Sequence, residues 1–442
     1  MRDLPEESRL ERLVRTLPID TRALGAVRRP HFLQLLAQQF AALAATFAIS
    51  FASLAKVVEL TGSGVQAAFT ILSVVVPGLL FGLLGGVTVD RVSRRTMLIV
   101  TNLLRGLLAV AAPLYLDLAP PEVLVPVILS VNFLLSAVGQ FNFPAEAALI
   151  PYLVSSEELL AANSLFNISY LAAIGFGSVV WGPLSVRFLG VEWSYFGSGL
   201  FFLISLLPLS RLPKDPAPRE RVLRRSRYAR LRHVMAVVAD VREGVVFALT
   251  SPSVGVAILA LASQTALALA MVAVFPVVMA TEFGIPIYNQ PLLALPAISG
   301  AGLGFLVLVS PFGNRQPRTR LVVGGNALIA LGLTGMTISL SLLEWGIRGV
   351  LASFPLVGIG FVLAYISGKS VLQEEPPDYL RGRVISLQLT LNNVVSLVPT
   401  VLAGWGLDVL GPTAVFVAAT VSFALLTVLA WLLVRAGSAQ YR

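Results

Sequence analysis

The stretch Gly86-Val87-Thr88-Val89-Asp90-Arg91-Val92-Ser93-Arg94-Arg95 is a charged hairpin between two long apolar runs. Residues 65–89 before it and 96–116 after it are each long enough to cross a bilayer, which takes about 20 apolar residues. The hairpin is therefore expected at one face of a membrane. Its arginines predict that this face is cytoplasmic, because Lys and Arg in short loops stay inside.

The composition favours a chain that crosses the membrane many times. Of its 442 residues, 56% are hydrophobic and 12% are charged, whereas a soluble globular chain carries roughly 25% charged residues. The net charge of +9 is attributed to orientation and to contact with anionic lipid headgroups, rather than to nucleic acid. With no cysteine, and with His31 and His233 as the only histidines, we expect no disulfide, no metal site and no cofactor.

Apolar runs of spanning length recur along the whole chain and predict an all-α membrane protein. Twelve spans are expected, at residues 32–55, 65–89, 96–116, 121–144, 158–185, 189–210, 253–279, 287–310, 321–343, 346–369, 384–407 and 411–434. Both chain ends then lie in the cytoplasm, and only Lys56, Arg187 and Arg348 of the 32 basic residues fall outside. The inverted orientation would place nearly all basic residues on the wrong side.

A long polar interruption divides the twelve spans into two sets of six. The expected parts are a cytoplasmic N-terminal segment (1–31), an N-terminal six-helix bundle (32–210), a cytoplasmic linker (211–250), a C-terminal six-helix bundle (251–434) and a cytoplasmic tail (435–442). The arginine-rich part of the linker is interpreted as a solvated, positive-inside loop, with a lipid clamp or RNA binding as alternatives. Short amphipathic helices on the inner membrane surface are expected near residues 10–17 and 233–250.

The two halves also repeat in sequence. A shift of 224 residues places Asp90-Arg91 on Asn314-Arg315 and Asn102 on Asn326. Residues 312–318 therefore read as a second, altered copy of the charged hairpin. Six plus six spans with a parallel internal repeat predict two pseudo-symmetric six-helix bundles.

The hairpin pattern Gly-x-x-x-Asp-Arg-x-x-Arg-Arg resembles the signature loop of the major facilitator superfamily of transporters, with Ser93 where that family usually has Gly. Residues 143–151 with 160–165, and residues 380–384, resemble the branch that includes macrolide efflux pumps and enterobactin-type siderophore exporters. The resemblance implies the major facilitator fold of twelve transmembrane helices and a secondary transporter whose halves rock. Without it, the hairpin is a cytoplasmic turn whose charge only sets topology.

The resemblance also implies a gate at the cytoplasmic face. Asp90 would tie the hairpin to the inner end of span eleven, because an anion at a helix N-terminus contributes about 0.3–1 kcal/mol. We expect Asp90→Asn to shift the resting state toward the outward-facing one. The expected gating residues are Gly86, Asp90, Arg91, Arg94, Arg95, Arg381 and Arg383.

Very few ionisable residues fall inside the spans, where each is costly. Arg105 lies nine residues into span three, and Glu146 lies near the inner end of span four. We expect the two to pair and to couple transport to protons. The alternative is a static charge network with Asp90 that serves only to make these charges tolerable.

Cavities in the superfamily are lined chiefly by the first, fourth, seventh and tenth spans. A largely apolar cavity with a few amides favours an amphipathic organic substrate over a sugar or a phosphate. For each amide, the alternative role is a hydrogen bond between helices. The expected substrate-binding residues are Gln38, Asn132, Phe133, Gln264 and Tyr365, with Asn167 and Asn392 as secondary candidates.

Exporters of the superfamily often carry a Gly-Pro pair with flanking glycines in the fifth span. This chain departs from that pattern after the proline, where Ser185 and Val186 replace glycines, and its residues 129–140 lack the antiporter-type arginine of span four. The residues that match are Gly175, Gly177, Gly182 and Pro183.

The sequence contains no phosphate-binding loop, metal pair or Ser-His-Asp set, so we do not expect an enzyme. We expect a monomeric, proton-coupled exporter of amphipathic small molecules, such as drugs or siderophores, in the bilayer of the cell membrane. Uptake or lipid flipping on the same fold is one alternative. A membrane sensor that does not transport is another.

Overall fold

The computed structural model describes residues 25, 28–89, 92–213, 243–342 and 346–440, and within these ranges every regular element is helical. Eleven helical segments of this part are long and apolar enough to cross a membrane. A further span is formed by Arg94–Val110 and Ala112–Leu118, which are bent by 42° relative to each other. The predicted all-α fold with twelve transmembrane helices is confirmed.

The spans of the first half are built from single helices and from helix pairs. Their elements are α3 (Pro30–Thr61), α4 (Gly64–Val89), α5 (Arg94–Val110), α6 (Ala112–Leu118), α7 (Pro121–Gly139), α8 (Asn142–Leu153), η1 (Ser156–Glu158), α9 (Leu159–Gly175), η2 (Phe176–Trp181), α10 (Gly182–Leu189), α11 (Val191–Ile204) and α12 (Leu206–Arg211).

The spans of the second half follow the same plan, and residues 243–250 before them are also helical. Their elements are α14 (Pro252–Thr281), η4 (Ile287–Ala294), α15 (Leu295–Val309), α16 (Pro311–Arg315), α17 (Arg318–Ser341), α18 (Gly346–Glu374), α19 (Asp378–Val395), α20 (Leu397–Leu410) and α21 (Pro412–Gln440). The helices expected near residues 10–17 and over most of 233–250 lie outside the described residues.

The chain forms two compact units. The first comprises residues 1–52 and 76–223, and the second comprises residues 53–75 and 224–442. The end of α3 and the first part of α4 therefore pack with the C-terminal helices, although the sequence repeat assigns them to the first half. Their Leu54, Val58 and Ala67 belong to the same apolar core as Val274 and Ile329.

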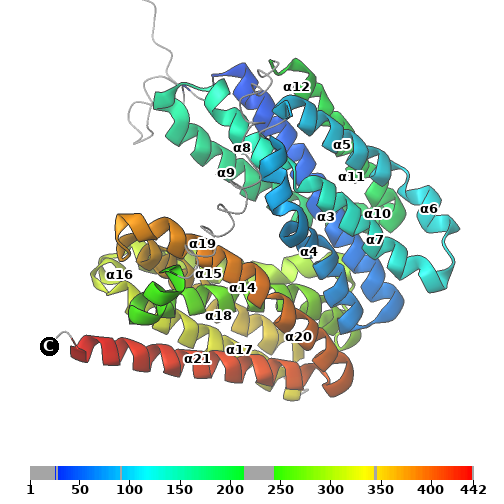
Figure 1. The fold of residues 1–442 in the computed structure, drawn as a ribbon. Helices are drawn as coiled ribbons and strands as arrows, with labels where there is room; N and C mark the ends of the chain where they lie inside the picture. The colour runs from blue at the N-terminus through cyan, green and yellow to red at the C-terminus, as the bar shows by residue number, and fades with distance from the viewer. Residues whose placement is uncertain (1–24, 26–27, 90–91, 214–242, 343–345, 441–442) are drawn as a thin grey trace, which may run out of the picture. The chain divides into compact units, whose positions relative to one another are not determined.

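In the first unit, α5 has several helices as neighbours (Figure 1). It packs against α7, α8 and α11, and α10 lies against α11. A glycine makes one of these approaches close: a Cβ at Gly199 of α11 would lie 2.7 Å from the backbone nitrogen of Val110. The neighbouring core contains Phe32, Leu98 and Ile150, all fully buried.

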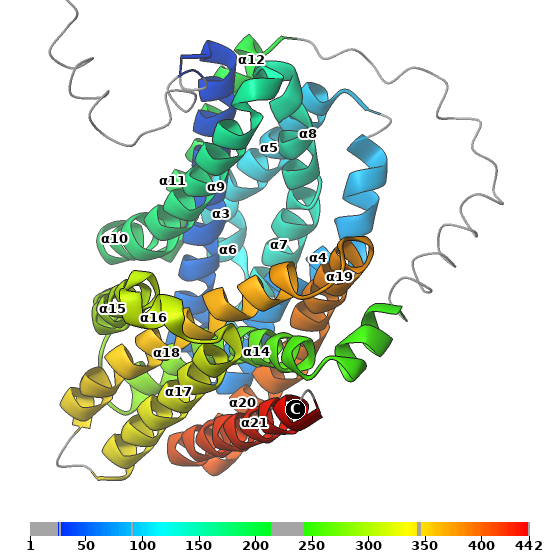
Figure 2. The same cartoon turned by 90° about the vertical axis from the view of Figure 1, so that its left-hand side faces the viewer.

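In the second unit, α17 and α18 lie side by side, with α15 against α18 and α21 along α17 (Figure 2). Small residues permit the α17–α18 contact, because helices in a membrane associate through close backbone packing. A Cβ at Gly325 of α17 would lie 2.6 Å from the carbonyl oxygen of Gly360 and 2.7 Å from the backbone nitrogen of Ala364.

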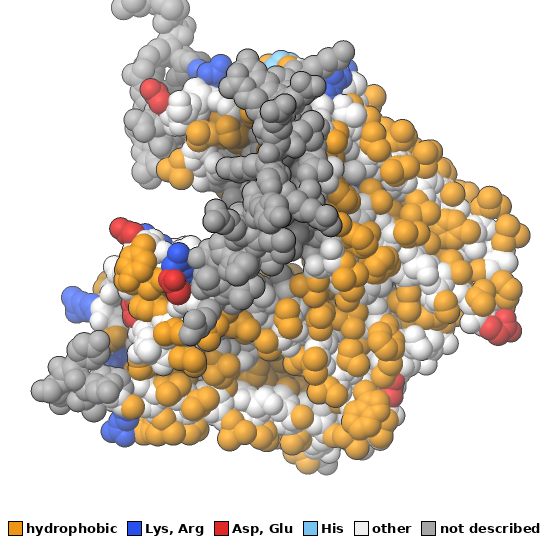
Figure 3. Space-filling view, in the orientation of Figure 1, with side chains coloured by type: hydrophobic (Ala, Val, Ile, Leu, Met, Phe, Trp, Pro, Cys, Tyr) orange, Lys and Arg blue, Asp and Glu red, His pale blue; other side chains and the backbone are white. Residues whose placement is uncertain are grey.

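Hydrophobic side chains cover most of the visible surface of both units (Figure 3). Leu107, Leu402 and Leu425 are more than half exposed. A water-soluble protein rarely exposes so much contiguous apolar area. The exposed leucines instead fit a surrounding hydrocarbon layer.

Two spans of the first half are not single regular α-helices. The fourth span consists of α7 and α8 and continues to Leu153, beyond the expected end at residue 144. The fifth span takes a π-helical turn at η2 and resumes as α10 at Gly182-Pro183. Such π turns are frequent at functional sites.

Two adjacent glycines of α17 give a direct test of the α17–α18 contact. We expect Gly325→Ala to lower the thermal unfolding temperature of the purified protein, because the added methyl collides with the α18 backbone at a cost of about 1–3 kcal/mol. Gly324→Ala is the matched control, since a Cβ there meets nothing within 4 Å. It should leave the temperature unchanged or raise it slightly. Equal effects of the two substitutions would contradict the packing.

Candidate functional site

A network of buried polar side chains crosses the first unit and is centred on Asn102 of α5. The Asn102 Nδ2 atom donates to Gln38 Oε1 of α3 at 3.2 Å and to Ser205 Oγ at 3.0 Å. The Asn102 Oδ1 atom accepts a hydrogen bond from Asn142 Nδ2 of α8 at 2.7 Å. Four spans, its own and those of Gln38, Asn142 and Ser205, are thus joined through one side chain.

The network ends on a carboxylate. Gln38 Nε2 donates to Glu146 Oε1 at 2.8 Å, so Gln38 connects Glu146 of α8 to Asn102. Gln38 and Asn102 are 0% exposed, and Glu146 is 3% exposed. In hydrocarbon each unsatisfied polar group costs several kcal/mol, so these side chains have to satisfy one another.

Arg105 lies about one helical turn beyond Asn102 and faces the same three neighbouring spans. Its guanidinium donates to the hydroxyl of Thr46 on α3 and lies over the ring of Phe202, 4.2 Å from the ring centroid. It also lies against α7, where a Cβ at Gly139 would be 3.4 Å from the Arg105 Cζ atom. Arg105 therefore places a buried cation next to the fourth span, which itself lacks one.

Arg105 and Glu146 do not form a direct ion pair. Each contacts α3 through a different residue, Thr46 for the arginine and Gln38 for the glutamate. The structure thus brings both residues predicted for proton coupling into one buried region of the first unit. It connects Glu146 to amides rather than to the guanidinium.

The substrate residues predicted in the first unit have separate environments. Gln38 belongs to the buried network. Asn132 of α7 is buried, and the adjacent Phe133 packs edge-on against Phe81, with 6.2 Å between ring centroids. Asn167 of α9 is exposed and donates to the backbone carbonyl of Asn163 in its own helix.

The substrate residues predicted in the second unit lie on three helices. Gln264 of α14 is fully buried, and neither of its amide atoms has a hydrogen-bond partner among the described residues. Tyr365 of α18 is 38% exposed and stacks on Phe361, with 5.7 Å between ring centroids. Asn392 of α19 is half-buried. A buried amide without partners favours a position that a ligand or water completes.

The predicted gate is only partly described. Asp90 and Arg91 lie outside the described residues, and Gly86 is part of α4. Arg94 lies over the ring of Tyr152 at 4.8 Å. Arg95 donates to the carbonyl oxygens of Leu209 and Ser210 at the end of α12, at 3.0 and 2.7 Å.

The cations predicted at the start of span eleven are engaged within the second unit. Arg381 forms an ion pair with Asp378 at 2.8 Å, one turn earlier in α19. Arg383 forms an ion pair with Glu243 of the helical segment 243–250. Arg383 therefore joins the C-terminal end of the linker to α19.

The second unit also contains a polar contact that we did not assign a role from the sequence. Asp408 of α20 accepts hydrogen bonds from the backbone nitrogens of Gly64 and Val65, at 2.5 and 3.0 Å, and from Ser63 Oγ at 2.6 Å. A carboxylate is the favoured partner of the unpaired N–H groups at a helix start. Gly404, one turn earlier in α20, lets the two backbones touch at Gly64.

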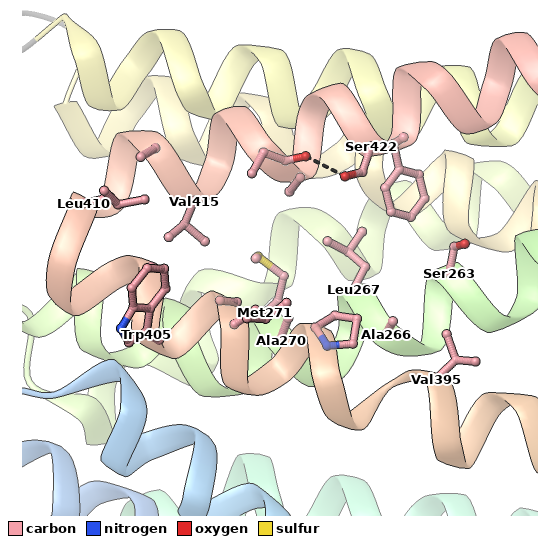
Figure 4. A pocket seen from close by; sticks show the side chains of 18 residues that line it. Ser263, Ala266, Leu267, Ala270, Met271, Val395, Trp405, Leu410, Val415 and Ser422 are labelled. Atoms are coloured by element: carbon pink, nitrogen blue, oxygen red, sulfur yellow. Dashed lines mark hydrogen bonds between the residues drawn. The ribbon is translucent and has the colours of Figure 1, made fainter.

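An apolar cavity of about 550 Å³ lies between α14, α20 and α21 of the second unit. Met271 and Leu267 of α14 line it together with Trp405 of α20 and Val415 of α21 (Figure 4). Ser422 at its edge donates to the backbone carbonyl of Ala418, so its hydroxyl is already satisfied. The cavity is therefore suited to a hydrocarbon group.

The internal repeat supplies a control for the Asn102 network. We expect Asn102→Ala to lower the thermal unfolding temperature by several degrees, because it leaves buried groups of Gln38 and Asn142 unpaired at about 1–3 kcal/mol each. Asn326 is the counterpart of Asn102 in the repeat, is equally buried, and has no partner for its amide among the described residues. Asn326→Ala should be neutral or stabilising. A smaller loss for Asn102→Ala than for Asn326→Ala would contradict the network.

The comparisons with known proteins agree with the fold. The sequence is 27% identical over 399 residues to the multidrug efflux pump Tap of Mycolicibacterium fortuitum, which covers 86% of this chain and 90% of that protein. It is 24% identical over 366 residues to the uncharacterized MFS-type transporter YfiS of Bacillus subtilis, covering 78% and 80%. The crystal structure of the nucleoside transporter NupG superposes with a TM-score of 0.67 at 14% identity, covering 91% of this chain and 98% of that one. The family model of the Major Facilitator Superfamily matches residues 35–400, and the chain belongs to that superfamily.

Proposed function

We propose that this transporter exports amphipathic small molecules across the cell membrane and that Glu146 couples export to protons. The observation that carries the proposal is a carboxylate inside a spanning segment that is bound to the amide of Gln38 and not to a cation. An ionisable residue in that setting is expensive and marks a proton or substrate path. The similarity to a protein named as a multidrug efflux pump supports the outward direction.

Protonation of Glu146 gives the network two hydrogen-bond arrangements. The ionised carboxylate only accepts, as it does from Gln38 Nε2. The protonated carboxyl gains an O–H donor that needs an acceptor, and in our proposal the Gln38 amide turns its Oε1 toward this O–H and gives up its bond to Asn102. Because these residues lie on α8, α3 and α5, the two arrangements favour two relative positions of these helices. A two-state element of this kind is what alternating access requires.

Aromatic and aliphatic groups support an amphipathic substrate. In the first unit Phe176 of η2 packs against Phe40 of α3 and Phe201 of α11, with ring centroids 5.6 and 6.4 Å apart. In the second unit the cavity of about 550 Å³ is almost entirely apolar. Ligand sites of such size and lining take organic molecules with few polar groups.

Export can be tested by the accumulation of a panel of dyes, macrolides and siderophore-like compounds in pump-deficient bacteria. Cells with the parent chain should accumulate less of at least one compound, and a protonophore should abolish the difference. Glu146→Gln should behave like the empty vector, because the amide cannot titrate, and Asp90→Asn should impair export through the gate. Arg435→Gln, which removes an exposed charge over the ring of Trp431, should export like the parent.

Three results would contradict the proposal. Higher accumulation with the parent chain would indicate uptake. Export that persists in Glu146→Gln at normal protein levels would exclude this carboxylate from coupling. An unchanged panel, followed by positive lipid-flip assays, would assign the fold to lipid movement.

We further propose that the Asp408 contact closes the end of the transporter opposite the charged hairpin and has to open in each cycle. The natural sequence has no cysteine, so one introduced thiol is a clean reporter. Asp408→Asn should raise maleimide labelling of Ala67→Cys severalfold, because Ala67 is 0% exposed in the core beside this contact. Leu60→Cys is the control, since Leu60 is already 46% exposed. Unchanged labelling at position 67 would show that Asp408 does not hold this end closed.

A further inference from the structure

Lys369 is an unusual cation in this chain. Only three of the 32 basic residues are lysines, and two of them, Lys56 of α3 and Lys369 of α18, lie inside long apolar helices. It lies five residues before the end of α18 at Glu374, or about 8 Å along the helix. It is half-buried and forms no ion pair with any carboxylate of the described residues.

Three carboxylates near the end of α18 have other partners, and a fourth, Glu374, is exposed. Glu375, just past the end of α18, accepts a hydrogen bond from Ser253 at the start of α14. Asp378 and Glu243 pair with Arg381 and Arg383. The positive charge of Lys369 is therefore not balanced locally by these groups, and it serves no ion pair that would hold helices together.

The partner of Lys369 is an amide that leaves a second donor unused. Lys369 Nζ donates to Gln388 Oε1 of α19 at 2.7 Å. Gln388 is 0% exposed, and its Nε2 atom has no hydrogen-bond partner among the described residues. The carbonyl end of the amide has to face the ammonium, so the NH₂ group is fixed as an additional donor. Two N–H donors of Lys369 and one NH₂ group of Gln388 thus remain without an acceptor in the part of the chain that the structure describes.

Aromatic rings continue the same helix face. Phe361, Tyr365 and Lys369 are spaced by four residues, so they lie on one side of α18. The Phe361 and Tyr365 rings stack with only 9° between their planes, and Lys369 Nζ lies 5.9 Å from the Tyr365 centroid. A flat apolar surface therefore adjoins a group of donors.

From these contacts we propose that Lys369, Tyr365 and Gln388 form a binding site for the anionic group of an amphipathic aromatic substrate. The ammonium and the Gln388 NH₂ group bind a carboxylate or sulfonate, and the stacked rings contact the organic body. This inference rests on the proposed transport function and names the charge of its substrate. A lysine that only extends toward the membrane surface would need neither the buried amide nor the ring pair.

The test compares matched anionic and neutral ligands on the purified full-length protein in phosphatidylcholine nanodiscs. The probes are five aromatic carboxylates, among them 2-naphthoate, and their primary amides, with affinity measured by equilibrium competition. The parent should bind carboxylates more tightly than amides. Lys369→Gln should lose about tenfold to a hundredfold in carboxylate affinity, because a charge-assisted hydrogen bond is removed, and should keep its affinity for amides.

Two further variants and one lipid test whether the binding is specific to this site. Arg435→Gln removes a cation elsewhere and should preserve the carboxylate preference. Tyr365→Leu should weaken both ligand classes equally. A soluble short-chain phosphatidylglycerol distinguishes a lipid headgroup from a free organic anion. The proposal is overturned if the parent shows no carboxylate preference, if Lys369→Gln retains it, or if only phosphatidylglycerol binds.

The result separates the site from the export proposal. Export without a Lys369-dependent preference for carboxylates refutes the site and leaves export in place. A Lys369-dependent preference in a protein that moves none of the panel compounds supports the site and refutes export.

Discussion

A polar group that is buried in a membrane needs a hydrogen-bond partner, and this need governs the chemistry of the molecule. Inside a hydrocarbon layer water does not supply that partner, so each polar side chain either binds another part of the protein or remains available for a ligand or a proton. In the first unit Asn102 satisfies Gln38, Asn142 and Ser205 together. In the second unit Gln264, Asn326 and the NH₂ group of Gln388 have no partner among the described residues. Gln39 of the first unit is likewise fully buried without a partner among the described residues. The Asn102 network is thus suited to a coupled hydrogen-bond rearrangement, and the unpartnered amides are suited to binding.

The internal repeat shows which residues differ between the two halves. The shift of 224 residues carries Gln38 to Ala262, Asn142 to Ile366 and Glu146 to Ser370. Arg105 falls on Ile329, a core residue of the second unit. Only the central asparagine is retained, as Asn326, and it has lost its partners. Two halves with one backbone plan therefore carry different polar side chains at the matched positions.

Span positions and the all-α fold followed from the sequence because length and apolarity decide whether a helix crosses a membrane. The family followed from the resemblance of the charged hairpin to a known signature loop. The polar residues were harder to assign. Gln38 was expected in a substrate cavity, but its amide lies between Glu146 and Asn102. The pairing of Arg105 with Glu146 was expected from charge, whereas the structure inserts uncharged side chains. Lys369 was overlooked because it lies at the edge of its predicted span. Which faces of three helices meet depends on packing, and neither hydropathy nor loop charge reports it.

The central claim is that Glu146 exchanges a proton as substrate binds, and proton release in solution tests it most directly. Purified protein in weakly buffered detergent would be mixed with a compound that the cells export, and the pH followed with an indicator dye. The account predicts that the parent releases protons on substrate addition and that Glu146→Gln binds the same compound with no release. Equal release from both proteins, or none from the parent, would contradict it.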